Sequence, residues 1–461
     1  MFKNFKKVHM VGIGGIGMSG IAEVLIAMNF NVSGSDKSLS EVTDRLEKLG
    51  SQIFEGHSAE NLVDVDVLVY SSAVSVDNPE VAEAIKRKIP VIRRAEMLAE
   101  LMRLRYGIGI AGTHGKTTTT SMVGLVLLEA GFDPTVIVGG KLSGLGGTNA
   151  RLGSGDFIVV EADEFDRSFL QLTPTIAAVT TLESEHLDIY KDIDDIKAAF
   201  AEFANKVPFY GFVVLCLDEE GLQDIIPKIN KKIITYGLTS QADVRAIEIE
   251  HYENTSSFEV EYKGKKIGNI KLAIPGIHNI QNALGAIAIA IELGIDFETI
   301  KKSLEKFNGV YRRFEVKAEI QDIMIIDDYA HHPTEVAATL KGIRAGWDRR
   351  IVAVFQPHLF SRTRDFYEDF AKSFLNCDVF ICLDIYPARE EPIQGITGEL
   401  LADSAKKFGH KNVLYVKDKN NLPDALINVV KSGDIVVTMG AGDIYQYGEK
   451  FIELMKTGRI N

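Results

Sequence analysis

The sequence has few cysteines and no long apolar segment. Only three cysteines, Cys216, Cys377 and Cys382, occur in 461 residues, and they show no C-x-x-C spacing. Their scarcity argues against a disulfide framework and a zinc knuckle, and it fits a reducing compartment. No run of about 20 apolar residues is present, and the apolar stretch behind the N-terminal lysines is interrupted by glycines and Glu23. We therefore expect a cytoplasmic protein that makes no use of a membrane.

An excess of positive charge is also missing. The formal net charge of −13 would repel a nucleic acid backbone, although a local cationic pocket could still bind a small anion. A hydrophobic fraction of 46% and a charged fraction of 25% are typical of a globular protein. Because domains run to roughly 100–200 residues, we expect the chain to form three of them.

Short apolar, β-branched segments alternate with helical patterns, which is typical of parallel α/β sheets. The stretch 91–105 has the pattern of a basic helix, and residues 243–275 show the period-two alternation of a β-ribbon. The predicted fold class is α/β with three domains. We expect a Rossmann-like domain over residues 1–105, a central P-loop domain with the β-ribbon over 106–310, and a C-terminal Rossmann-like domain over 311–461.

The first glycine-rich stretch, VHMVGIGGIGMSGIAEVL at residues 8–25, runs from an apolar strand into a helix. Gly12, Gly14 and Gly17 form the G-x-G-x-x-G pattern that holds a pyrophosphate at a helix N-terminus. Asp36 follows about 20 residues later, where a ribose hydroxyl is often bound. Taken alone, the pattern suggests a nicotinamide or flavin oxidoreductase, but that alternative leaves the motifs below without a role.

A second glycine-rich stretch, GIAGTHGKTTTT, places Gly112, Gly115, Lys116 and Thr117 between a predicted strand and a helix. Backbone N–H groups there can hold phosphate oxygens, Lys116 can reach the terminal phosphates, and Thr117 is suited to Mg²⁺. Ile110 occupies the place of the first glycine of the strict P-loop pattern. We therefore interpret the stretch as a P-loop variant that binds ATP.

Acidic side chains end the next predicted strands. DFIVVEADE and TLESEHLD supply Glu161, Asp163, Glu183, Glu185, His186 and Asp188. Mg²⁺ takes hard oxygen ligands and shares them with phosphates, so we expect one ion at the first group and a second ion at the other.

Histidines and arginines mark the third domain. DDYAHHPTEV and FQPHLFSRTRDF contain Asp327, Asp328, Tyr329, His331, His332, His358, Arg362 and Arg364. Adjacent residues leaving a strand point in different directions, so we expect only one of the paired histidines to face a given site. A guanidinium fork after a strand is suited to binding a carboxylate.

These motifs, taken in order, resemble those of the Mur ligases of peptidoglycan synthesis over essentially the whole chain. The resemblance rests on GIGGIGMS, SSAV, GTHGKTTT, EADE, PFYG, HNIQN, YRRFE, DDYAHHPTE and QPH..SRTRD. It implies an ATP-dependent ligase that phosphorylates the lactyl carboxylate of UDP-N-acetylmuramate and lets the amine of L-alanine displace the phosphate. It also implies ATP and two Mg²⁺ ions as cofactors, with no nucleic acid or membrane partner, in a monomer or weak homodimer.

The resemblance assigns roles to individual positions. Lys116, His186, His331 and Arg362 are the expected catalytic residues, and Thr117, Glu161 and His186 are the expected metal ligands. The expected ATP-binding residues are Gly112, Thr113, His114, Gly115, Lys116, Thr117, Thr118, Asn279, Asn282, Arg313 and Asp328. The UDP-sugar would be bound by Gly12, Gly14, Gly15, Gly17, Met18, Ser19, Asp36, Ser71 and Ser72, and the amino acid by Tyr329, His331 and Arg362.

Some positions depart from the family pattern. Leu359 stands where we expect a second arginine, so the carboxylate of the amino acid would fall to Arg362 alone or to Arg364. Thr181, Glu185 and Phe165 also differ from the usual residues. Two other functions remain open: a recycling ligase that joins UDP-N-acetylmuramate to a preformed tripeptide, and a regulatory P-loop ATPase.

Overall fold

The computed structural model describes residues 5–142, 148–184, 189–388 and 390–457, and His186 lies outside the described residues. The described residues form three β-sheets, and the chain divides into two compact units. Unit 1 comprises residues 1–248, 258–270 and 281–307 and carries the first sheet and most of the second, while unit 2 comprises residues 249–257, 271–280 and 308–461 and carries the third.

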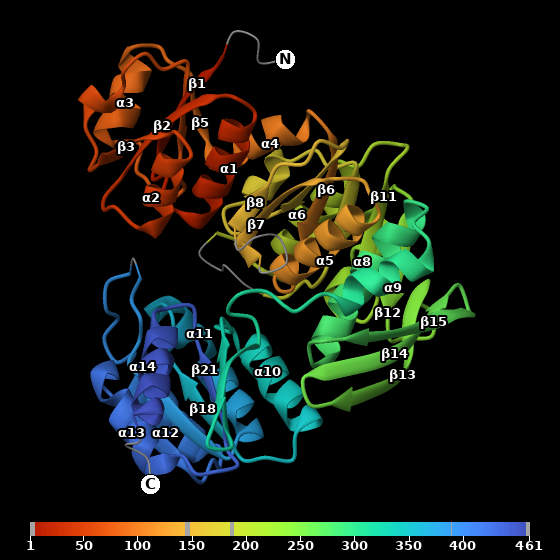
Figure 1. Cartoon of the computed structure of the whole chain (residues 1–461), viewed down its shortest axis with the longest axis vertical. Helices are drawn as coiled ribbons and strands as arrows, with labels where there is room; N and C mark the ends of the chain where they lie inside the picture. Colours follow the sequence, from red (N-terminus) through yellow and green to blue (C-terminus); the bar gives the residue numbers. More distant parts are fainter. Residues whose placement is uncertain (1–4, 143–147, 185–188, 389, 458–461) are drawn as a thin grey trace. The chain divides into compact units, whose positions relative to one another are not determined.

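The first sheet is parallel, with the order β3-β2-β1-β4-β5 (Figure 1). Its strands are β1 (Lys7–Val11), β2 (Asn31–Asp36), β3 (Gln52–Glu55), β4 (Val67–Tyr70) and β5 (Val91–Arg93), and its helices are α1 (Ile16–Ala27), α2 (Glu41–Lys48), α3 (Pro79–Lys86) and α4 (Arg94–Met102). Val11 and Leu68 pack against Val81 and Ala84 of α3. The prediction of one helix over 91–105 is wrong at its start, because the first three residues pair with β4 as strand β5.

The second sheet has ten strands in the order β15-β14-β13-β12-β11-β10-β6-β9-β7-β8. Its main strands are β6 (Tyr106–Ala111), β7 (Thr135–Leu142), β8 (Thr148–Arg151), β9 (Phe157–Glu161), β10 (Ile176–Val179), β11 (Phe212–Cys216) and β12 (Ile233–Gly237), and the helices that connect them are α5 (Lys116–Glu129), α6 (Ile193–Asn205) and α7 (Glu220–Gln223). Because β6 pairs in parallel with both β9 and β10, the chain that leaves β6 lies between the ends of these two strands.

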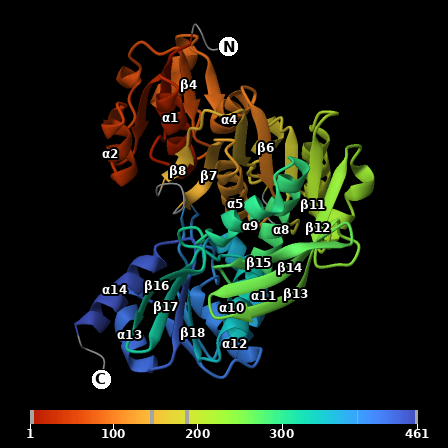
Figure 2. The ribbon, with the colours of Figure 1, turned by 45° about the vertical axis from the view of Figure 1, so that its right-hand side comes forward.

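The predicted β-ribbon is present as three strands at one end of the second sheet (Figure 2). They are β13 (Val244–Tyr252), β14 (Thr255–Tyr262) and β15 (Lys265–Leu272), followed by helices α8 (Ile277–Glu292) and α9 (Phe297–Glu305). Along β14, Ser256, Phe258 and Val260 are buried and alternate with half-buried residues, which is the burial that period-two alternation predicts.

The third sheet has the order β16-β17-β21-β18-β19-β20 and is parallel except for β16. Its elements are β16 (Glu315–Ile320), β17 (Ile323–Asp328), α10 (Pro333–Gly346), β18 (Ile351–Phe355), α11 (Phe360–Ser373), β19 (Val379–Leu383), α12 (Gly398–Lys407), β20 (Val413–Val416), α13 (Leu422–Val429), β21 (Ile435–Met439) and α14 (Ile444–Lys456).

Helices cover both faces of this sheet, so its central strands are apolar on both sides. Ala353 and Phe355 of β18 belong to a core formed with α10, α11 and α12. Val352 and Val354 belong to the opposite core, formed with α13 and α14. The predicted fold class is confirmed, since all three sheets are α/β and mostly parallel. In the part of the chain that the structure describes, no helix has the length and apolar character needed to cross a membrane.

Candidate functional site

The first glycine loop connects β1 to α1 and is held by the end of β2. Gly12 has φ +78°, and the N–H groups of Gly12 and Ile13 donate to the carbonyl of Ser35 at 2.8 and 3.1 Å. The Gly14 N–H donates to Asp36 Oδ2 at 2.9 Å. Gly15 is the N-cap of α1 and has no side chain to occupy the helix N-terminus, which leaves that terminus suited to an anion.

Of the other predicted UDP-sugar residues, Ser71 is half-buried, Ser72 is exposed, and two residues in α1 are buried. Ser71 and Ser72 follow β4 at the same edge of the sheet, and the Ser71 hydroxyl accepts from the Ala73 N–H at 3.3 Å. Met18 and Ser19 are buried in α1. The Ser19 hydroxyl donates to the Ile16 carbonyl at 3.0 Å and accepts from Asn149 Nδ2 at 3.1 Å, so it stabilises the helix from inside.

The second glycine loop connects β6 to α5, and two of its glycines have no room for a side chain. A Cβ on Gly112, which has φ +135°, would lie 2.2 Å from Thr180 Oγ1 and 2.9 Å from the Thr181 nitrogen. Gly115 has φ +80°, and its Cβ would lie 2.5 Å from Asn282 Oδ1. The sequence therefore needs glycine at both positions for steric and conformational reasons.

Neighbouring polar residues fix the rest of this loop. The Thr113 N–H donates to the Thr181 carbonyl at 3.1 Å, and the His114 N–H donates to Thr181 Oγ1 at 2.7 Å. The unusual Thr181 thus supports the loop directly. Glu183 Oε2 lies 3.4 Å from His114 Nε2, and Thr118 is buried in the first turn of α5.

Lys116 is oriented by a glutamate that the sequence analysis missed. Its Nζ donates to Glu164 Oε1 and Oε2 at 2.9 and 2.8 Å and to the carbonyls of Gly112 and Thr113 at 2.5 and 3.2 Å. The Glu164 side chain is only 2% exposed. A buried carboxylate without a cation would be costly, so this pair is mutually required. Glu164 is the last residue of the EADE motif, of which only Glu161 and Asp163 were named as candidates.

Glu161 and Thr117 form the candidate Mg²⁺ site. Glu161 ends β9, accepts the Gly139 N–H at 2.8 Å and is hydrogen bonded to the Thr117 side chain. Burial raises the pKa of the Glu161 carboxyl, and the nearby Lys116 and these hydrogen bonds oppose that rise. A hydroxyl beside a carboxylate at a phosphate loop is a donor set suited to Mg²⁺. The prediction that His186 binds a second ion falls outside the described residues.

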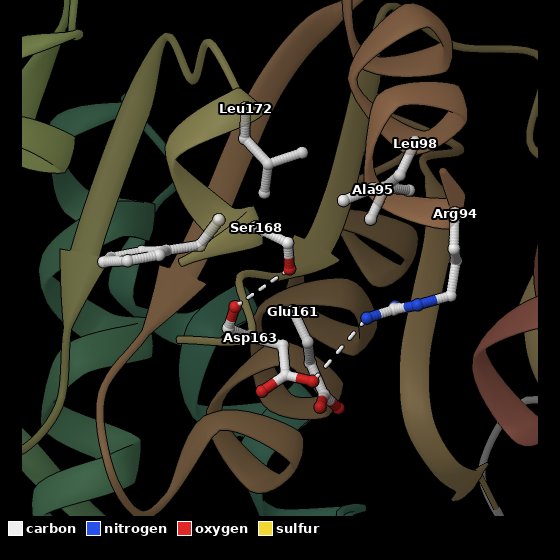
Figure 3. Close-up of a pocket in the computed structure, with 8 residues that line it drawn as sticks. Arg94, Ala95, Leu98, Glu161, Asp163, Ser168 and Leu172 are labelled. Carbon is white, nitrogen blue, oxygen red and sulfur yellow. Dashed lines mark hydrogen bonds and ion pairs between the residues drawn. The ribbon is translucent and has the colours of Figure 1, made fainter. Parts of the chain in front are cut away.

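A small pocket next to Glu161 contains Arg94, which the sequence analysis assigned only to a basic helix (Figure 3). Arg94 Nη2 lies 3.6 Å from Asp163 Oδ2. A Cβ on Gly17 would lie 3.0 Å from Arg94 Nη1, so the guanidinium covers the first turn of α1. Arg94 therefore places positive charge between the first glycine loop and the carboxylates that follow β9.

Two of the predicted ATP-binding residues, Asn279 and Asn282, are buried in the first turns of α8 and have protein partners. Asn279 Nδ2 donates to the carbonyl of Pro275, which precedes the helix, at 2.7 Å. Asn282 Oδ1 accepts from Thr119 Oγ1 at 3.2 Å. Asn282 thereby links α8 to the first turns of α5.

In unit 2, the two arginines of the YRRF segment have different environments. Arg312 is buried and donates to Asp327 Oδ2 at 2.9 Å and to the carbonyls of Gly442 and Gly440 at 3.1 and 2.6 Å. Arg313 is more exposed, and its Nη1 lies 3.3 Å from Glu335 Oε1. Arg312 therefore stabilises the fold, while Arg313 stays partly exposed beside Glu335.

Asp328 is an internal anchor at the end of β17. It accepts the N–H groups of Phe314 and Ala330 at 3.0 and 2.8 Å and the Thr339 hydroxyl at 3.2 Å. Burial raises the pKa of its carboxyl to about 6, against the opposing effect of Arg313. Tyr329 and His331 follow it at the carboxyl edge of the sheet, with ring centroids 5.1 Å apart.

The predicted carboxylate-binding arginines lie on α11. Arg362 is half-buried. Arg364 is exposed and donates to Asp365 at 2.7 and 3.0 Å, which leaves Arg362 as the better candidate. Leu359, just before the helix, has φ +72°, a conformation that costs a branched side chain on the order of 1–3 kcal/mol. His358 stacks on Tyr386 at 5.7 Å between centroids.

Comparison with known proteins covers nearly the whole chain. Residues 7–106 match the model described as Mur ligase family, catalytic domain, residues 110–290 match the Mur ligase middle domain, and residues 312–442 match the Mur ligase, glutamate ligase domain. The UDP-N-acetylmuramate–L-alanine ligase of Geotalea uraniireducens is 57% identical over 99% of both chains, and that of Geobacter sulfurreducens is 53% identical over 100% of both.

Solved structures show the same similarity. The UDP-N-acetylmuramate–alanine ligase of Thermotoga maritima superposes with a TM-score of 0.84 at 30% identity, covering 98% of this chain and 99% of that one. A murein peptide ligase from Psychrobacter arcticus superposes less closely, with a TM-score of 0.71 at 25% identity, covering 97% of this chain and 98% of that one.

Proposed function

The chain belongs to the Mur ligase family, and we propose that it joins L-alanine to the lactyl carboxylate of UDP-N-acetylmuramate in an ATP-dependent reaction of peptidoglycan synthesis. The observation that carries this proposal is the full-length identity to ligases of that name. The loop geometry supports it, because a lysine, a hydroxyl and a carboxylate gather at one phosphate-binding loop.

In the first half-reaction, the lactyl carboxylate attacks the terminal phosphorus of ATP, and the bond from that phosphorus to ADP breaks. Lys116 at the second glycine loop is placed to neutralise charge on the transferred phosphoryl group. Thr117 and Glu161 would hold Mg²⁺, which supplies charge stabilisation to the phosphates. The first glycine loop and the helix N-terminus behind it would bind the pyrophosphate of the UDP-sugar.

In the second half-reaction, the amine of L-alanine attacks the acyl carbon, loses a proton, and the bond to phosphate breaks. Arg362 would bind the carboxylate of the amino acid, which leaves the amine free to attack. Tyr329 and His331 lie at the edge of the third sheet, where ligands of such sheets bind. The nucleotide substrates and three free, buried cysteines support a cytoplasmic location.

Phosphate release measured with each substrate omitted in turn tests this proposal. We expect release to require UDP-N-acetylmuramate, L-alanine, ATP and Mg²⁺ together. Equal release without L-alanine would favour a regulatory ATPase, and release only with a tripeptide would favour the recycling ligase. A panel containing glycine and L-serine would define the amino-acid selectivity, since near-isosteres differ by only about 1–3 kcal/mol in such a pocket.

A further inference from the structure

One carboxylate in unit 2 binds two residues that the resemblance assigns to the reaction. Glu335 lies in the first turn of α10, and its side chain is 11% exposed. Its Oε1 lies 3.3 Å from Arg313 Nη1, and its Oε2 accepts the His331 N–H at 2.9 Å. We infer that Glu335 is a positioning residue that sets the orientation and tautomer of His331 and holds the guanidinium of Arg313. The inference about catalysis rests on the proposed function.

The position of the His331 ring supports a single tautomer. Its Nδ1 lies 3.0 Å from the Tyr329 carbonyl and 3.1 Å from Glu335 Oε2. Both neighbours are acceptors, so Nδ1 must carry the hydrogen. In the neutral ring this leaves the lone pair on Nε2, which can accept a proton or a hydrogen bond from a ligand amine.

The two adjacent arginines, Arg312 and Arg313, have different carboxylate partners. Arg312 is bound by Asp327 inside the fold, whereas Arg313 has Glu335 as its carboxylate partner. Arg313 Cζ also lies 5.2 Å from the centre of the Tyr329 ring. Glu335 thus links Arg313, which precedes β16, to His331, which follows β17, and it does so from the start of a helix whose first residue is Pro333.

Nitrogen-15 NMR of the full chain labelled in its histidines tests the tautomer directly. The His331 signals are assigned from the spectrum that loses them in His331→Gln. We expect protonated Nδ1 in the neutral ring of the wild type and a mixture of tautomers in Glu335→Ala, because only the Tyr329 carbonyl then remains as an acceptor. Protonated Nε2 in the wild type, or an unchanged tautomer in Glu335→Ala, would overturn the inference.

Kinetics of the same variants test the consequence for the reaction. Loss of such an orienting partner typically lowers activity about 10- to 100-fold, and we expect this loss in kcat for Glu335→Ala, with a raised KM for L-alanine. The KM for UDP-N-acetylmuramate should stay within about twofold, because the residues expected to bind it lie in unit 1. Glu335→Gln keeps an oxygen acceptor and should recover part of the activity, which a purely structural loss would not explain.

The exposed Glu453 on α14 provides a matched control, and Glu453→Gln should behave like the wild type. If the wild type itself shows no alanine-dependent turnover, the proposed function fails while the NMR result still decides the role of Glu335. Fluorescence of Trp347, the only tryptophan of the chain, verifies that unit 2 is folded in each variant. A folded Glu335→Ala variant with wild-type kinetics would also contradict the inference.

Discussion

The two glycine loops of unit 1 have the same strand, loop and helix order but different partners. In the first, the Gly14 N–H is bound by Asp36, and the nearby cation, Arg94, comes from α4. In the second, the loop contains its own cation, Lys116, which Glu164 holds in place. The first loop therefore presents a helix N-terminus whose nearby cation comes from another helix, and the second carries a charged group of its own.

This difference shows that a glycine pattern identifies a phosphate-binding loop but not its role. The first pattern alone suggested a dinucleotide cofactor. The partners outside the motif distinguish the two loops, since a fixed N–H array can bind a pyrophosphate, whereas phosphoryl transfer also needs charge compensation.

Lys116→Ala gives the largest expected effect and tests this division of roles. We expect product formation to fall by at least about 10²–10³-fold, because the variant loses the charge that stabilises the transition state. Binding of UDP-N-acetylmuramate, measured by calorimetry, should stay within severalfold of wild type. A folded variant that loses both together would contradict the assignment of separate roles to the two loops.

The third sheet differs from both, because its strand β17 is not followed by a glycine loop. A buried aspartate at the end of β17, Asp328, binds the neighbouring backbone instead. The folded-state pKa of Asp328, about 6, lies above its ordinary value of 3.8. The folded state therefore binds this proton more tightly than the unfolded state does. The resulting gain in the free energy of unfolding is fully present below about pH 4 and is lost as the pH rises through about 6. The contribution is at most about 3 kcal/mol.

Trp347 reports this effect, because it stacks on Phe314, whose N–H is bound by Asp328. Unfolding in guanidinium chloride can be followed by Trp347 fluorescence. We expect the denaturant concentration at the midpoint of unfolding to fall between pH 4 and pH 7 more steeply in wild type than in Asp328→Asn, because the asparagine cannot titrate. The comparison of slopes removes the effect of other titrating groups. Parallel slopes in the two proteins would show that Asp328 does not carry the shifted proton.

The alternation of strands and helices and both glycine loops were accessible from the sequence, because they depend on local patterns of apolar residues and glycines. Strand β5 was not, since Val91–Arg93 is too short for its periodicity to be distinguished from that of the following helix. The resemblance assigned Ser19 to the UDP-sugar, and nothing in the glycine motif indicates that its hydroxyl accepts a hydrogen bond from Asn149, 130 residues away.

The glutamates that bind Lys116 and Arg313 were also missed, because they are distant from these cations in the sequence. Glu164 lies 48 residues from Lys116, and Glu335 lies 22 residues from Arg313. Both glutamates belong to quoted motifs, but only the fold shows that they face a cation and not solvent. Their role follows from strand order, which brings the ends of separate strands to one edge of a sheet.

Gly14→Ala gives the smallest expected effect and tests the first loop. The new Cβ would lie 2.9 Å from Asp36 Oδ2 and 3.2 Å from Thr43 Cγ2, so the carboxylate must move away from the N–H that it accepts. Loss of one such hydrogen bond costs about 1 kcal/mol, and we expect UDP-N-acetylmuramate to bind roughly fivefold more weakly. ATP binding should be unchanged, because Lys116 and Glu164 keep their contacts.

Gly342→Ala, whose Cβ would have no neighbour closer than 3.7 Å, is the control. Weaker ATP binding in Gly14→Ala would mean that the two loops act as one site.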